Sequence, residues 1–290
     1  MNVAILFAIG AALLIGTYLF LVKRYFSHYP ASVYAALTNA FALAWYLPVA
    51  ALTLDARPIP HGFGSLGAAV FAVTVGFTIL GILTFFWALQ SGAVSYVAPI
   101  SKIIPVFVLP LEVVLLEQHL TPLQVAGVVI VTAAVYVANY RPGELLEPFR
   151  RAVTSRAAAL ALASAAAFGV VDVGKRTLMQ ELSLPPQTYV VALFAAVIVV
   201  FGPLAARQRP DDLRSTLPVF AVAGLLVAAG NHLIMLSLQD LPASIASPIV
   251  NTQAVFAVVL GGVVLGEQYF RIRLVAAVLA VAGVAVLALG

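Results

Sequence analysis

The chain consists of long apolar runs separated by short polar segments. A helix needs about 20 apolar residues to cross a bilayer. Runs of this length predict an all-α integral membrane protein with ten spanning helices, at residues 3–22, 31–53, 66–90, 94–116, 122–140, 157–178, 186–206, 217–239, 243–265 and 271–289. Thr121 to Gln124 fits a capping box that opens the fifth of these helices.

One stretch, Ala88 to Glu117, is apolar and still contains three prolines and two charged residues within the predicted span: Pro99, Pro105, Pro110, Lys102 and Glu112. A charge at the bilayer centre costs roughly 2.5–3.5 kcal/mol on insertion scales, and each proline removes a backbone donor. The combination predicts a broken helix that lines a substrate path. Alternatively, neighbouring helices satisfy these groups and the residues serve packing alone.

The same stretch recurs near the end of the chain, between Ser237 and Glu267. At a constant offset of 149, the matches are Gly81 with Gly230, Gln90 with Gln239, Ser95 with Ser244, Pro99 with Pro248 and Phe107 with Phe256. A slip of one residue then aligns Glu117-Gln118 with Glu267-Gln268. The chain therefore contains an internal duplication, which decides the architecture before any other pattern.

Each copy contains five predicted spans, with the first in residues 1–140, a loop at 141–156 and the second in residues 157–290. Because five is odd, the second copy must enter the membrane in the opposite sense to the first. This predicts two five-helix repeats of inverted topology, a design that transporters use to rock two similar halves about a central site.

The composition agrees with a membrane protein, because 63% of the residues are hydrophobic, 9% are charged and the mean hydropathy is +1.09. Soluble domains carry about 25% charged residues. The N-terminal run has no preceding basic segment and is too long for a cleaved signal, so we read it as a retained span. The absence of cysteine excludes disulfides and thiol chemistry.

Basic residues in the loops predict the orientation. Eleven fall on the side of the loop at 141–156, and three, Arg57, Lys175 and Arg176, fall on the other, with Lys102 inside a span. The count places the central loop in the cytoplasm and both termini outside, in a multi-pass protein of the inner membrane. The net charge of +4 thus reports on topology, and we expect no nucleic-acid partner.

The polar residues of the repeated helix share one face, with Ser95, Pro99 and Lys102 in the first copy and Ser244, Pro248 and Asn251 in the second. We expect this face to line a cavity that holds a small amphipathic solute. Further polar or aromatic groups in or near the spans are assigned to the same cavity: Tyr96, Trp87, Gln90, Gln239, Asn231 and Asn39.

Four other residues are candidates for gating or coupling: Asp172, Lys175, Glu112 and His232. Asp172 precedes Lys175 and Arg176 by three and four residues, so both cations can reach it along a helix. This group is either a neutralised surface pair with a snorkelling lysine or a gate. Glu112 lies deeper in its span and needs a partner.

Other motifs carry less weight. The segment Gly62 to Gly67 matches G-x-G-x-x-G, but it follows a polar loop and no βαβ unit surrounds it, which argues against nucleotide binding. The four histidines lack metal-ligand spacing. We therefore expect no cofactor and no metal, and we favour a monomer.

The duplicated elements resemble the EamA family of the drug/metabolite transporter superfamily over essentially the whole chain. The resemblance is carried by Ala88-Leu89-Gln90, Pro99, Pro105 and Leu115-Leu116-Glu117, and by Leu238-Gln239, Pro248 and Leu265-Gly266-Glu267. It implies ten helices, a cavity between the halves and, in bacteria, export of amino acids, metabolites or drugs. Within the family the chain is most similar to amino acid exporters of the YddG type, although Ala98 stands in a segment that is usually aromatic-rich there.

The sequence thus favours a carrier that exports amino acids or similar metabolites by alternating access. Multidrug or quaternary-cation efflux is the alternative, with Glu112 and Asp172 as candidate membrane carboxylates. Lys102 argues against it, because an ammonium group in the cavity favours a solute with a carboxylate. An intramembrane enzyme is less favoured, since the sequence shows no metal cluster, thiol or nucleophile–base pair.

Overall fold

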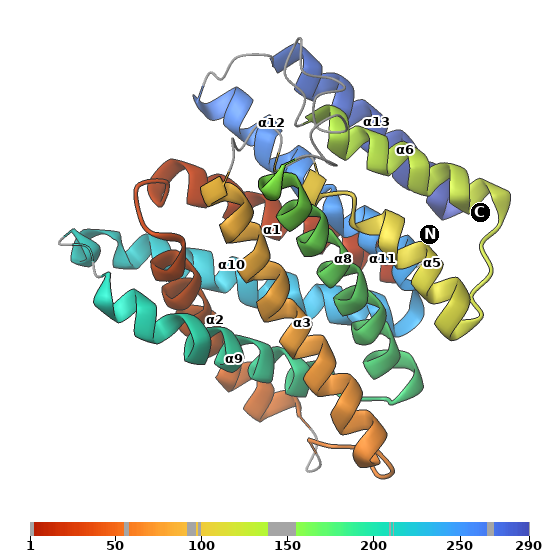
Figure 1. The fold of residues 1–290 in the computed structure, drawn as a ribbon, viewed down its shortest axis with the longest axis horizontal. Coiled ribbons are helices and arrows are strands. Elements are labelled where there is room, and N and C mark those ends of the chain that lie inside the picture. The colour runs from red at the N-terminus through yellow and green to blue at the C-terminus, as the bar shows by residue number, and fades with distance from the viewer. Residues whose placement is uncertain are drawn as a thin grey trace.

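The structure is a computed structural model that describes residues 3–54, 58–91, 97, 100–138, 155–208, 210, 212–265 and 270–289. Every regular element in these ranges is a helix. The elements are α1 Val3–Tyr25, α2 Ala31–Thr53, α3 Gly64–Ser91, α5 Ile104–Leu116, α6 Pro122–Ala138, α8 Arg156–Arg176, the π-helical turn η1 Thr177–Glu181, α9 Pro186–Arg207, α10 Leu213–Asp240, α11 Ala243–Asn251, α12 Gln253–Leu265 and α13 Phe270–Leu289 (Figure 1).

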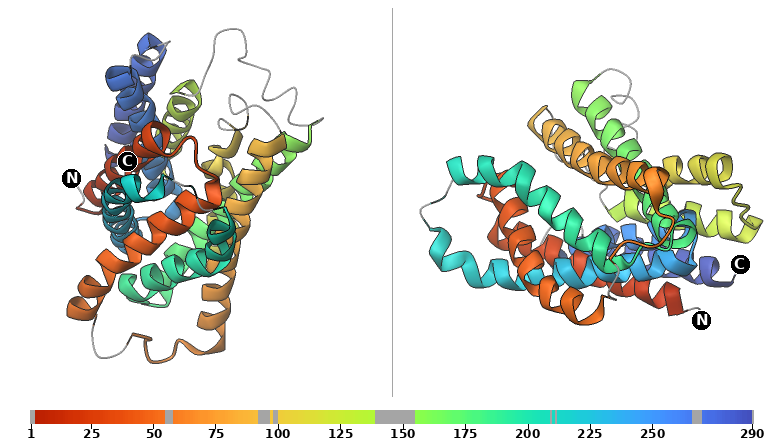
Figure 2. Two further views of the ribbon diagram at one scale, coloured as in Figure 1. Left: turned by 90° about the vertical axis from the view of Figure 1, so that its left-hand side faces the viewer. Right: turned by 90° about the horizontal axis from the view of Figure 1, so that it is seen from below.

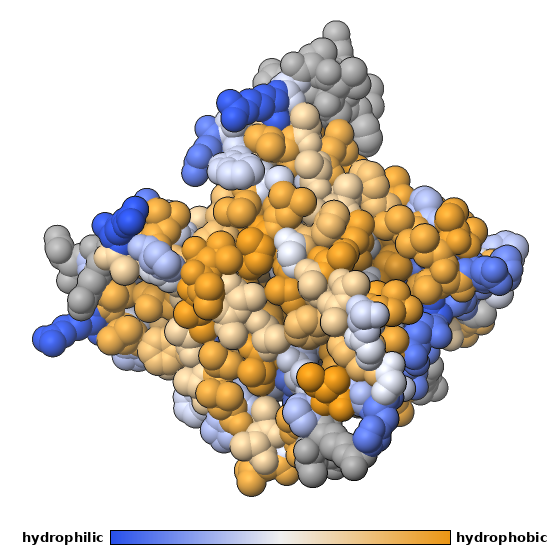
Figure 3. All heavy atoms as spheres, turned by 60° about the horizontal axis from the view of Figure 1, so that its bottom comes forward, coloured by the Kyte–Doolittle hydropathy of each residue, from blue (hydrophilic) through white to orange (hydrophobic). Residues whose placement is uncertain are grey.

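Among the described residues, seven helical segments are long and apolar enough to cross a membrane, counting α8 with η1 and α11 with α12 as one segment each. Three further apolar helices are shorter, at Ile104–Leu116, Pro122–Ala138 and Leu274–Leu289. The surface matches this assignment, because one broad face is almost entirely apolar and hydrophilic residues gather toward its ends (Figure 3). The chain is thus an integral membrane protein of helices, and the full count of ten spans stays a prediction.

Two predicted spans are interrupted rather than continuous. The first interruption falls at Lys102 and Ile103, just before α5, and the second falls at Thr252, between α11 and α12. The two positions correspond at the repeat offset of 149. Our expectation that the prolines themselves break these helices is wrong for Pro248, which lies inside α11. Pro248 is the sixth of the nine residues of α11, and it removes one backbone hydrogen bond. The helix nevertheless continues for three residues beyond it, to Asn251.

The helices pack in pairs that join the two halves of the chain. α1 packs on α10 and α3 packs on α8, while α2 packs on α9 and α6 on α13. The last two pairs lie at opposite ends of the view in Figure 1, and Figure 2 shows α3 running beside α8. Small residues allow the closest approaches, since a β-carbon on Gly283 of α13 would lie 2.9 Å from the backbone nitrogen of Val131 in α6.

Local signals set several helix starts. The predicted capping box is confirmed, because the Thr121 amide donates to Gln124 Oε1 at 2.9 Å and the Gln124 amide donates to Thr121 Oγ1 at 3.1 Å. Ser155 caps α8 by accepting the Ala158 amide at 3.2 Å. Gly62 and Gly64 adopt φ angles of +84° and +51° where the chain turns into α3, so the glycine motif forms a helix entry.

Candidate functional site

A cavity of about 170 Å³ lies where the second interrupted helix faces α8, α10 and the start of α5. Its walls combine residues that are far apart in the sequence, from both copies of the repeat. They are Lys102, Ile104, Phe168, Asp172, Lys175, Ile234, Leu238, Ala246, Ser247, Val250, Asn251 and Gln253.

Among the described residues, three charged ones line this cavity: Lys102 from the first half and Asp172 and Lys175 from α8. Asp172 Oδ2 accepts a hydrogen bond of 2.5 Å from the Ser247 hydroxyl of α11. The carboxylate attracts both ammonium groups. The Lys175 Nζ also lies 6.0 Å from the centre of the Tyr189 ring, close enough for a cation–π contact.

The interruption after Asn251 shapes one wall of the cavity. Asn251 Nδ2 donates to the Ser247 carbonyl at 2.9 Å, and Thr252 Oγ1 donates to the Ile249 carbonyl at 2.6 Å. These side chains add donors to carbonyl groups in the last two turns of α11, where the Thr252 amide also donates to the Ile249 carbonyl at 3.1 Å. The helix therefore ends at the cavity without unpaired backbone at those two positions and presents Ser247 and Asn251 to the interior.

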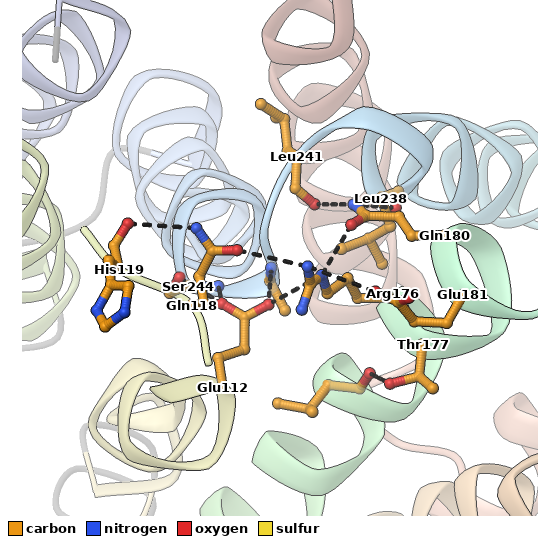
Figure 4. A network of polar contacts seen from close by, with 12 residues as sticks. Glu112, Gln118, His119, Arg176, Thr177, Gln180, Glu181, Leu238, Leu241 and Ser244 are labelled. Atoms are coloured by element: carbon orange, nitrogen blue, oxygen red, sulfur yellow. Dashed lines mark hydrogen bonds and ion pairs between the residues drawn. The ribbon is translucent and has the colours of Figure 1, made fainter. Parts of the chain in front are cut away.

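A buried ionic cluster holds the other end of α11. The Glu112 side chain is fully buried and accepts the amides of Ala243 at 2.6 Å and Ser244 at 2.8 Å, as well as the Ser244 hydroxyl. Arg176 Nε lies 3.5 Å from Glu112 Oε1. Figure 4 shows the carboxylate directed at the start of α11, with Arg176 beside it. A negative charge at a helix N-terminus is favourable because the first amide groups have no partners within the helix.

Arg176 also links α8 to the segments around this cluster. Its Nε donates to Gln180 Oε1 at 2.8 Å, and its Nη2 reaches Gln118 Oε1 at 3.4 Å. Gln180 lies in the π-helical turn that extends α8 and donates to the carbonyl groups of Leu238 and Leu241, each at 2.9 Å. The cluster therefore joins both halves of the chain at one side of the cavity.

The structure brings together four of the residues that the sequence singled out: Lys102, Asn251, Asp172 and Lys175. The interpretation of Asp172 and Lys175 as an exposed surface pair is wrong, because Lys175 is 8% exposed and faces the cavity. The expected approach of Arg176 to Asp172 also fails, because its guanidinium turns to Glu112 instead. Glu112, which lies deep within its predicted span and needed a partner, has Arg176 as its counter-ion.

Other predicted site residues lie elsewhere. Ser244 contacts Glu112, Asn39 and Asn231 donate to carbonyl groups of their own helices, and His232 Nδ1 lies 2.7 Å from the Tyr46 hydroxyl. Trp87, Gln90 and Gln239 are exposed at the surface. Pro248 is buried inside α11 without lining the cavity. Ser95, Tyr96 and Pro99 lie outside the described residues.

Two polar residues that line the cavity were not singled out from the sequence, Ser247 and Gln253. Both carried a usable signal. Ser247 precedes Asn251 by one helical turn, and Gln253 matches the cavity residue Ile104 at the repeat offset. In the described ranges no group of three His, Cys, Asp or Glu residues is placed to hold a metal ion.

Comparison with known proteins identifies the family. The model of the EamA-like transporter family matches residues 2–140 and again residues 155–289. A crystal structure described only as that of a protein is similar in fold, with a TM-score of 0.78 at 17% identity over 99% of this chain and 97% of the other. A search of curated proteins gave no match. The chain therefore belongs to the EamA-like transporter family and is a multi-pass membrane transporter of the drug/metabolite kind.

Proposed function

We propose that this protein exports amino acids or similar small metabolites across the inner membrane, by alternating access through the cavity at Lys102. The observation that carries the proposal is the pairing of ammonium and carboxylate side chains around one small cavity. An α-amino acid carries the complementary pair, a carboxylate for Lys102 and an ammonium group for Asp172. Apolar walls and a few well-placed polar groups are typical of small-molecule sites.

Alternating access requires two halves that can move about the site, and we propose ten membrane helices in two inverted five-helix repeats. The packing supports this arrangement, because exchanging the halves converts the α1–α10 pair into the α8–α3 pair and maps α2–α9 and α6–α13 onto themselves. The cavity supports it too, since Lys102 matches Asn251 and Ile104 matches Gln253 at the same offset. The site would then lie on the axis between the repeats.

Efflux of cationic drugs is the second candidate, and Asp172 is the membrane carboxylate that it would use. The surroundings of Asp172 favour the first proposal, because Lys102 and Lys175 line the same cavity. A permanent cation would be repelled by both ammonium groups. Glu112, the other carboxylate considered for this role, is already committed to α11 and Arg176.

The test is uptake into proteoliposomes with a panel of labelled amino acids, with and without a pH gradient. We expect Lys102→Ala to abolish or strongly weaken amino acid transport, because the substrate carboxylate loses its partner. A decarboxylated amine analogue should lose less. Arg214→Ala is the control, since it removes an exposed cation that does not line the cavity.

Inserted and folded Lys102→Ala protein that transports amino acids at the wild-type rate would refute the proposed site. If the loss of transport merely tracks a loss of folded protein, Lys102 is structural. Amino acid recognition would then have lost its main support.

A further inference from the structure

We infer that the cavity selects solutes with one more negative than positive charge, the class to which acidic α-amino acids belong. The inference rests on the proposed function and narrows its substrate. It follows from the charges that line the cavity in the described residues: two ammonium groups, on Lys102 and Lys175, and one carboxylate, on Asp172. With all three ionised, the site carries a formal charge of +1.

The other buried acid in the described residues does not cancel this excess. Glu112 is fully buried, but its carboxylate is used by two amides and a hydroxyl of α11 and by Arg176 at 3.5 Å. Glu112 and Arg176 therefore form an ion pair (Figure 4), and their formal charges cancel. Glu181 also lies 3.8 Å from Arg176, on the exposed side of the cluster, and adds nothing to the cavity.

The remaining wall offers amide, hydroxyl and apolar groups. Asn251, Gln253 and Ser247 are neutral, and Phe168, Ile104, Ile234, Leu238, Ala246 and Val250 are apolar. A buried charge is costly unless a partner of opposite sign lies close by. A bound solute that supplies one extra negative charge therefore compensates the excess ammonium group.

An acidic amino acid matches this pattern group by group. Its two carboxylates can each take one lysine, and its ammonium group can take Asp172, whose Oδ2 already accepts one hydrogen bond from Ser247. A carboxylate has room for further donors beyond that bond. A neutral amino acid has a single carboxylate and leaves one of the two lysines unpaired. A dicarboxylate without an amino group offers no cation to Asp172.

The experiment compares three solutes of nearly equal size in the full-length protein in proteoliposomes. L-glutamate, L-glutamine and glutarate differ only in the groups that the three charged residues would recognise. We expect L-glutamate to be transported about tenfold or more in preference to L-glutamine, because sites built to pair with a polar group reject analogues that lack it. L-glutamate should exceed glutarate in the same way.

Two variants test the assignment of each group through ratios, which do not depend on the amount of protein. Lys175→Met should lower the preference for L-glutamate over L-glutamine by about tenfold, since one carboxylate then has no partner. Asp172→Asn should instead shift the preference from L-glutamate toward glutarate. Arg214→Ala, outside the cavity, should shift neither ratio.

The outcomes separate this inference from the proposed function. Transport of L-glutamine at least as good as that of L-glutamate in the wild-type protein overturns the charge selectivity, while amino acid export stands. Unchanged ratios in both variants overturn the assignment of the three charged groups. If the panel contains no transported amino acid at all, the proposed function fails and this inference fails with it.

Discussion

Replacing Glu112 with alanine should strongly destabilise the folded protein. The carboxylate is fully buried and lies at the start of α11, where it accepts two backbone amides and one hydroxyl. Arg176, itself 7% exposed, lies 3.5 Å away. Alanine would remove the acceptor of the α11 amides and the counter-ion of the arginine together.

The magnitude follows from these contacts. Breaking a buried ion pair by removing one partner costs about 3–5 kcal/mol, because an uncompensated charge stays buried. Buried donors that lose their acceptor cost about 1–3 kcal/mol each. These costs overlap, since Arg176 and the amides share the same two oxygens, so we expect a total loss of about 3–5 kcal/mol. Glu112→Gln should lose less, because the amide oxygen can still accept one of the α11 donors.

The assay is reversible unfolding in mixed detergent micelles, followed by helix content. Glu181→Ala is the matched control, because it removes the other acid near Arg176, at 3.8 Å and with a side chain 54% exposed. We expect that control to lose no more than about 1 kcal/mol, as exposed ion pairs do. A loss below about 1 kcal/mol for Glu112→Ala would refute the reasoning, since a buried partner cannot be that dispensable.

Three shorter predictions test topology, packing and bending. A reporter fused after Gly290 should read as lying outside the cytoplasm, and a cytoplasmic reading would overturn the charge count. Gly224→Ala should destabilise the fold, because its β-carbon would lie 2.7 Å from the Ala42 nitrogen, whereas Gly76→Ala, with nothing within 4 Å, should be neutral or slightly stabilising in the same unfolding assay. Replacing Pro99 and Pro248 together with alanine should leave the protein folded but slow its transport in proteoliposomes, because stiffer helices would bend less near the interruptions. Transport by the double variant at the wild-type rate would contradict a role for bending of these helices in transport.

Repetition and polarity made part of the site predictable from the sequence. Lys102 and Asn251 could be predicted because each is a polar residue in an apolar segment, where burial of a polar group is costly. The two residues also occupy equivalent positions of the repeat. The offset also anticipates where the second interruption falls once the first is known. The positions of the prolines did not predict the exact break, because α11 continues past Pro248 and ends only at Asn251. There the Thr252 amide and hydroxyl both donate to the Ile249 carbonyl.

Contacts between side chains on different helices could not be predicted from the sequence. Helix spacing favours a contact between Arg176 and Asp172, which are four residues apart. The arginine turns to Glu112 because a fully buried carboxylate on another helix competes for it, and that helix is 64 residues away in the chain. Trp87, Gln90 and Gln239 show the same limit, because polarity within an apolar segment does not say whether a residue faces a cavity or the surface.

Both copies of the repeat contribute residues to the cavity, and two positions at which the copies differ carry charge in the first copy only. Lys102 corresponds to Asn251 at the offset of 149, and both line the cavity. Glu112 corresponds to Gly261 at that offset and to Gly262 at an offset of 150. The first difference puts a positive charge on one side only, which an asymmetric solute such as an amino acid needs if it is to bind in one orientation. At the second position, Glu112 of the first copy accepts the amides at the start of α11. The second copy has glycine there, so it offers no matching carboxylate to the first copy. A carrier built from two identical halves could not orient such a solute, and we therefore propose that recognition depends on the residues at which the two copies differ.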